Sequence, residues 1–139
     1  MHFWMRPMQE RAYEKRGEQY LLIKSPPASG KSRALMFIAL HKLNEQKLKQ
    51  VIVVVPEKAI GSSFNNEPLT KFGFYWDWSV EPKWNLCNAP GDDNGGKVNS
   101  VKAFLDSEDK VLVCTHATFR FAVDRFGVDA FDNCLIAVD

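Results

Sequence analysis

Four short apolar runs along the chain read as strands: Tyr20–Lys24 (YLLIK), Val51–Val55 (VIVVV), Val111–Thr115 (VLVCT) and Cys134–Val138 (CLIAV). Their apolar positions are continuous rather than alternating, which is typical of strands covered on both faces of a parallel sheet. Helices are expected over Met5–Lys15, from Gly30 to about Leu48, around Val98–Leu105, and from His116 to about Phe126. Strands alternating with helices predict an α/β domain with right-handed crossovers.

The second predicted helix changes character along its length. It is apolar nearly all round from Ala34 to Leu40, which predicts a buried first half. Its last part, HKLNEQKLKQ, is rich in lysine. Those lysines could form a nucleic-acid patch, but a solvated helix end, favoured by the helix dipole, is the preferred interpretation.

The stretch from Gly61 to Asp109 is less regular and is interpreted as an elaboration of the same domain. It contains the turn-rich segment NAPGDDNGG, residues 88–96, which predicts a loop. Aromatic residues gather between Phe72 and Trp84 with few basic residues among them. Such rings can stack on single-stranded bases, but the shortage of cations favours packing in a core or an interface.

Composition narrows the class of protein without naming a partner. The 139 residues amount to one domain or part of one, with a net charge of +1 that argues neither for nor against nucleic acid. No apolar run approaches the ~20 residues that span a bilayer, so no membrane partner is expected. The three cysteines include no CxxC pair. They are expected to be free thiols, which predicts a reducing, cytoplasmic setting.

The strongest chemical signal is SPPASGKS, Ser25–Ser32, between a predicted strand and a long helix. Backbone N–H groups at a helix N-terminus can face a polyphosphate, a lysine can neutralise it, and a serine hydroxyl can bind Mg²⁺. Ser25 stands where the full motif has glycine, and Pro26 and Pro27 donate no N–H. The predicted ATP-binding residues of this loop are therefore Ala28, Ser29, Gly30, Lys31 and Ser32, with Lys31 also assigned a catalytic role.

The last strand ends in an acidic residue, as a Walker B motif does. CLIAVD delivers the Asp139 carboxylate to the carboxyl edge of a parallel sheet, where Mg²⁺ would be held. Ser32 and Asp139 are therefore the predicted Mg²⁺ ligands, and Asp139 is assigned a catalytic role beside Lys31.

Together these motifs resemble a superfamily 2 helicase, DEAD/DEAH-type, and most closely the helicase-type subunit of type I and type III restriction enzymes. In RPMQ, residues 6–9, the resemblance implies that Arg6 and Gln9 read adenine; the alternative is an ordinary helix start with proline in its first turn. VIVVVPEK, residues 51–58, is similar to motif Ia, and VLVCTH, residues 111–116, is similar to motif Ib. The resemblance implies nucleic-acid contacts at Pro56, Lys58, Thr115 and His116, although Thr115 also suits a helix cap.

The resemblance implies a P-loop NTPase fold: a partial RecA-like ATP-binding domain over residues 1–139, truncated at the Walker B strand of residues 134–139. The expected function is the ATP- and Mg²⁺-binding part of a helicase or translocase acting on nucleic acid, DNA rather than RNA. The 139 residues alone are expected not to hydrolyse ATP, because the glutamate after Asp139 and the second motor domain are missing. A second copy or further sequence would complete the sheet. The alternatives are a P-loop kinase or other phosphotransferase, and a binding module without hydrolysis.

Overall fold

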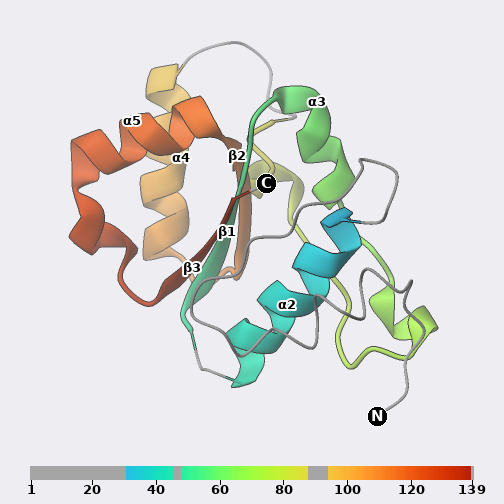
Figure 1. The fold of residues 1–139 in the computed structure, drawn as a ribbon. Coiled ribbons are helices and arrows are strands. Elements are labelled where there is room, and N and C mark those ends of the chain that lie inside the picture. Colours follow the sequence, from blue (N-terminus) through green and yellow to red (C-terminus); the bar gives the residue numbers. More distant parts are fainter. Residues whose placement is uncertain (1–30, 46–47, 88–93, 139) are drawn as a thin grey trace.

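A computed structural model describes residues 31–45, 48–87 and 94–138 of the chain. A three-stranded sheet lies between α2 on one face and the α4–α5 pair on the other (Figure 1). The helices and strands are α2 (Lys31–Glu45), β1 (Gln50–Val55), α3 (Lys58–Gly61), α4 (Asn94–Asp106), β2 (Val111–Thr115), α5 (His116–Phe126) and β3 (Cys134–Val138). The predicted strand 20–24 and helix 5–15 lie outside the described residues.

The sheet is parallel and has the order β2-β1-β3. Val51 pairs with Val111 on one side and with Leu135 on the other. Every residue of the central strand β1 is buried, whereas in β3 only Ala137 is. The three predicted strands in the described part of the chain are confirmed, and burial explains the continuous apolar sequence of β1 and β2. Whether a further segment or a second copy pairs with the other side of β3 stays a prediction.

Helix α2 confirms the prediction of a buried first half, with Ala34, Met36 and Phe37 at most 1% exposed. The solvated-end interpretation is wrong for Lys42, which is only 7% exposed. The described helix ends at Glu45, and Leu48 is not helical.

Helix α4 is longer than its sequence predicted. It begins at Asn94 and takes in Gly95 and Gly96, so the expectation of a loop through residue 96 is wrong at residues 94–96. Glycine lowers helix propensity by about 1 kcal/mol. Tertiary packing overrides that preference, because the helix buries an apolar face of Val98, Val101, Phe104 and Leu105 beside α5.

The segment of residues 64–84, here called the aromatic elaboration, packs mainly into the core. Trp78 is 1% exposed and its Nε1 donates to the Phe64 carbonyl at 2.8 Å. The ring of Phe74 lies 4.8 Å from that of Phe37 on α2, between centroids. Tyr75, by contrast, is 60% exposed. The packing interpretation is therefore confirmed for Phe74 and Trp78, and the contacts fasten this segment to α2.

The three cysteines are free, as predicted. Burial raises the pKa of Cys114, in the middle of the sheet, to about 12. At pH 8 a thiol with that pKa is ionised in about one molecule in ten thousand. We therefore expect iodoacetamide at pH 8 to alkylate the partly exposed Cys134 first and to leave Cys114 unmodified until the chain unfolds. Peptide mass spectrometry of native and urea-treated samples measures this, and equal native rates at Cys114 and Cys134 would contradict it.

Candidate functional site

The carboxyl edge of the sheet gathers the residues that follow its strands. Because the strands are parallel, Val55 at the end of β1 pairs with Thr115 at the end of β2, and Val54 pairs with Val138. Pro56 and His116 therefore leave the sheet at the same edge. Ligand sites of open α/β sheets lie at this edge, so it is the candidate site.

The first turn of α2 approaches the same edge. The helix runs opposite to β1 (Figure 1), and its last turns lie near Val111, at the amino end of β2. Ser32 is partly exposed in the first turn, which contains no acidic residue. Of the predicted nucleotide-site residues, Arg6, Gln9, Ala28, Ser29, Gly30 and Asp139 lie outside the described residues, as does the side-chain placement of Lys31.

Arg33, also in the first turn, is engaged by two neighbouring side chains. Its Nη2 lies 3.7 Å from Glu67 Oε2. Its guanidinium carbon lies 4.6 Å from the centre of the Phe72 ring. The aromatic elaboration thus anchors the start of α2, which the sequence did not reveal because these contacts join residues more than thirty positions apart.

Helix α3 places the residues predicted from motif Ia. Pro56, Glu57 and Lys58 are exposed, so their side chains are accessible to a ligand. Behind them, Gly61 packs so closely that a Cβ there would lie 2.4 Å from Cys87 Cβ. Asn85 donates from Nδ2 to the Gly61 carbonyl at 3.3 Å. The exposed turn therefore rests on a close-packed base.

Thr115 and His116 join β2 to α5 directly. The Thr115 hydroxyl oxygen accepts the Thr118 N–H at 3.3 Å and caps the helix, so the capping interpretation is confirmed. His116 Nε2 is buried and has no hydrogen-bond partner among the described residues. An imidazole nitrogen without a partner is costly inside a protein, and because this atom is buried a ligand at the edge would reach it only if its surroundings moved.

Positive charge lies close to the same edge. Burial raises the pKa of Cys87, and the nearby ammonium groups of Lys97 and Lys58 oppose that rise. Lys97 belongs to the first turn of α4, so the amino ends of α4 and α5 both contribute here. Helix amino ends and lysines favour anions. Sequence reasoning missed Lys97, because it had placed the start of α4 in a loop.

The described residues contain neither a metal cluster nor a membrane span. No group of three His, Cys, Asp or Glu side chains in these ranges is placed to hold a metal ion. No helix in the described part is long and apolar enough to cross a membrane. The predicted Mg²⁺ pair, Ser32 and Asp139, stays a prediction, since Asp139 lies outside the described residues.

Sequence comparison adds a relative to this geometry. A protein of Bacillus subtilis (strain 168) named "Putative ATP-dependent helicase YeeB" is 57% identical to the chain over 137 residues. The chain is similar to a helicase-named protein. The match covers 99% of this chain and 22% of that relative, so the chain spans about a fifth of the relative's length. No family model and no solved structure matches the chain.

Proposed function

We propose that the chain is the ATP-binding part of an ATP-dependent nucleic-acid helicase or translocase. One observation carries this proposal. The sequence SGKS leads straight into α2, whose first turn lies at the carboxyl edge of a parallel sheet where β1 and β2 also end. The helicase name of the 57% identical relative supports it.

Two features of the described residues support this ATP site. The first turn of α2 carries no carboxylate to repel a phosphate, and Ser32 is accessible. Ala28 to Ser32 would hold the phosphates, Arg6 and Gln9 the adenine, and Ser32 with Asp139 the Mg²⁺. When bound, ATP supplies the phosphoryl group whose transfer to water drives such motors.

Within the chain, the cation at the phosphates is Lys31 rather than its neighbour. Arg33 is engaged by Glu67 and by the Phe72 ring, so its charge is directed toward the aromatic elaboration. A lysine ammonium is a compact charge that suits a phosphate. Lys31 therefore binds the β- and γ-phosphates in this proposal and orients them against the amide groups of the loop.

The nucleic acid is proposed to lie along α3 and the start of α5. Pro56 and Lys58 are exposed there, and Lys58 supplies the charge that a phosphate backbone attracts. The Thr115 hydroxyl is already occupied as a cap, so its contact would come through the backbone. His116 follows it at the start of α5, and its Nε2 is buried with no hydrogen-bond partner among the described residues. DNA rather than RNA, and a superfamily 2 motor of the restriction-enzyme type, are the finer parts of this proposal.

A small-molecule kinase is less well supported by the described residues. Such an enzyme needs a mobile segment that brings arginines over the phosphates. Arg120 and Arg125 both belong to the regular helix α5, and the Arg125 guanidinium lies 5.7 Å from the Phe126 ring centre. The described residues therefore support a helicase better than a small-molecule kinase.

Replacing Lys31 tests the ATP site. We expect Lys31→Ala to weaken binding of a fluorescent ATP analogue by about tenfold or more, because a hydrogen bond to a charged group contributes about 1.5–3 kcal/mol. Lys102→Ala is the matched control: it also removes one positive charge, but its ammonium pairs with Asp106 on α4 at 3.2 Å. Equal affinity of Lys31→Ala and the parent chain would show that the phosphate loop does not bind ATP. Repeating the titration with DNA and RNA oligonucleotides present tests the nucleic-acid part.

A further inference from the structure

A second concave site lies at the opposite edge of the sheet from the candidate ATP site. A cavity of about 360 Å³ opens between the last turns of α2, the segment from Trp76 to Trp84, and the turn that enters β2. Its lining includes Leu40 of α2 and Val111, the first residue of β2, which places it at the amino edge. Its volume lies within the range of about 300–1,000 Å³ typical of ligand sites.

The wall of this cavity, here called the acidic groove, carries four carboxylates and a single lysine: Asp77, Glu81, Glu108 and Asp109 against Lys110. Two of the carboxylates are held in place. Asp109 Oδ2 accepts the Trp84 indole N–H at 2.6 Å, and Asp77 Oδ1 accepts the Thr70 N–H at 2.9 Å. That backbone hydrogen bond lowers the pKa of Asp77, so its carboxylate stays ionised at neutral pH.

The groove also has an aromatic floor. Trp84 is 7% exposed, and its ring meets Phe104 edge-on, with centroids 5.4 Å apart. Its indole N–H donates to Asp109 and its ring is mostly covered, so Trp84 forms the buried base of the groove rather than an open stacking face. Trp76 is partly exposed in the same lining. Indole faces attract cations, because the ring quadrupole is negative above its plane.

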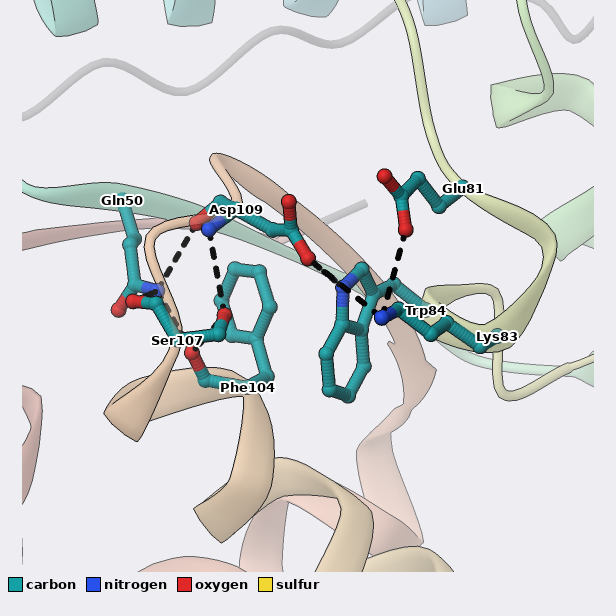
Figure 2. Close-up of polar contacts among 7 residues, drawn as sticks. All are labelled: Gln50, Glu81, Lys83, Trp84, Phe104, Ser107 and Asp109. Carbon is teal, nitrogen blue, oxygen red and sulfur yellow. Dashed lines mark hydrogen bonds and ion pairs between the residues drawn. The ribbon is translucent and has the colours of Figure 1, made fainter.

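The chain itself shows what this wall attracts. Lys83 Nζ lies 5.1 Å from the centre of the Trp84 ring, 3.6 Å from Glu81 Oε2 and 3.9 Å from Asp109 Oδ2 (Figure 2). Its side chain is 63% exposed, so the ion pairs are weak and open to exchange. The Lys83 ammonium therefore already lies near a tryptophan ring and two carboxylates, as a bound cation would.

We propose that the acidic groove binds an arginine-bearing segment of a partner protein. Charge complementarity selects a cationic occupant, and the tryptophan floor selects one that can stack. A guanidinium does both, since it lies flat on an indole and pairs with carboxylates through two parallel N–H groups. Nucleic acid is disfavoured, because its phosphates would meet four carboxylates. The site is remote from the ATP site, so it stands or falls independently of the proposed function.

The test uses the ¹⁵N-labelled chain and two short peptides, acetyl-Gly-Arg-Gly-Arg-Gly-amide and the same peptide with glutamine for arginine. We expect the arginine peptide alone to shift the indole N–H resonances of Trp76 and Trp84, and added salt to reduce the affinity. The double variant Asp77→Asn, Glu108→Gln should bind about three- to tenfold more weakly, because it removes two exposed carboxylates that would pair with the arginines.

Neither variant side chain holds the floor: Glu108 makes no hydrogen bond or ion pair with a described residue, and asparagine at 77 can still accept the Thr70 N–H. The double variant Asp124→Asn, Asp129→Asn, which removes two exposed carboxylates on α5 and just after it, is the charge-matched control and should bind like the parent. Unchanged affinity of the double variant, or equal shifts with the glutamine peptide, would overturn the proposal. So would the same indole shifts with a ten-nucleotide oligo(dT), which would make the groove a base-stacking surface instead.

Discussion

Replacing Trp78 with alanine is expected to lower the free energy of unfolding by about 3–5 kcal/mol, the usual cost of removing a large buried aromatic side chain. Trp78 is 1% exposed and lies 6.4 Å from Phe64, between ring centroids. Its backbone also exchanges hydrogen bonds of 2.9 and 3.0 Å with Glu67. The ring is therefore the centre of the aromatic elaboration, and its loss leaves a cavity there.

Urea unfolding followed by circular dichroism measures this loss. Tyr75→Ala is the matched control, because Tyr75 belongs to the same segment but is 60% exposed. It should change the stability by no more than about 0.5 kcal/mol. Equal losses in the two variants would contradict the packing described for Trp78.

The second large effect is expected at Gln50, where the side-chain amide closes the turn between α4 and β2. Gln50 Nε2 donates to the carbonyls of Phe104 at 2.7 Å and Asp109 at 2.9 Å (Figure 2). A third contact, to the Ser107 carbonyl, is 3.3 Å. Gln50 is 1% exposed, so water cannot replace these bonds without opening the core.

Gln50→Leu keeps the volume but removes the donor, and we expect it to cost about 1–3 kcal/mol, the penalty of a buried polar group left unpaired. The Phe104 carbonyl still accepts from Ser107 Oγ at 2.7 Å, which limits the loss. Hydrogen exchange of the amides of residues 107–110 should also accelerate. Lys102→Leu, on the exposed face of α4, serves as the control, and unchanged exchange in Gln50→Leu would show that the turn is held by other contacts.

The strands were predictable because their signal is local. Each of β1, β2 and β3 is a continuous apolar run, and in β1 and β2 burial on both faces of the sheet accounts for that pattern. The start of α5 was also predictable, since Thr115 is a good cap for a helix that follows at once.

Other features were not predictable because they depend on residues distant in sequence. Gln50 and Phe104 are 54 positions apart, yet their hydrogen bond fixes the end of α4. The start of α4 rests on packing that overrides two glycines. The burial of Lys42, in the polar part of α2, is also not apparent from its sequence neighbours. The acidic groove joins three separate segments, so no window of sequence contains it.

The candidate ATP site divides in the same way. Lys31 and Ser32 were predicted from a motif whose chemistry is contiguous in sequence, and both lie in α2. The position of Pro56 and His116 at one edge follows from the parallel pairing of β1 and β2. Lys97 and the unpaired His116 Nε2 needed the three-dimensional arrangement.

The joint between β2 and α5 has a mechanical consequence. Thr115 is at once the last residue of the strand and the cap of the helix, so no flexible linker separates the two. A displacement of the amino end of α5 is therefore expected to move β2 as well. Through the pairing of Thr115 with Val55 it is also expected to act on the central strand β1. We expect β2 and α5 to move as one rigid unit.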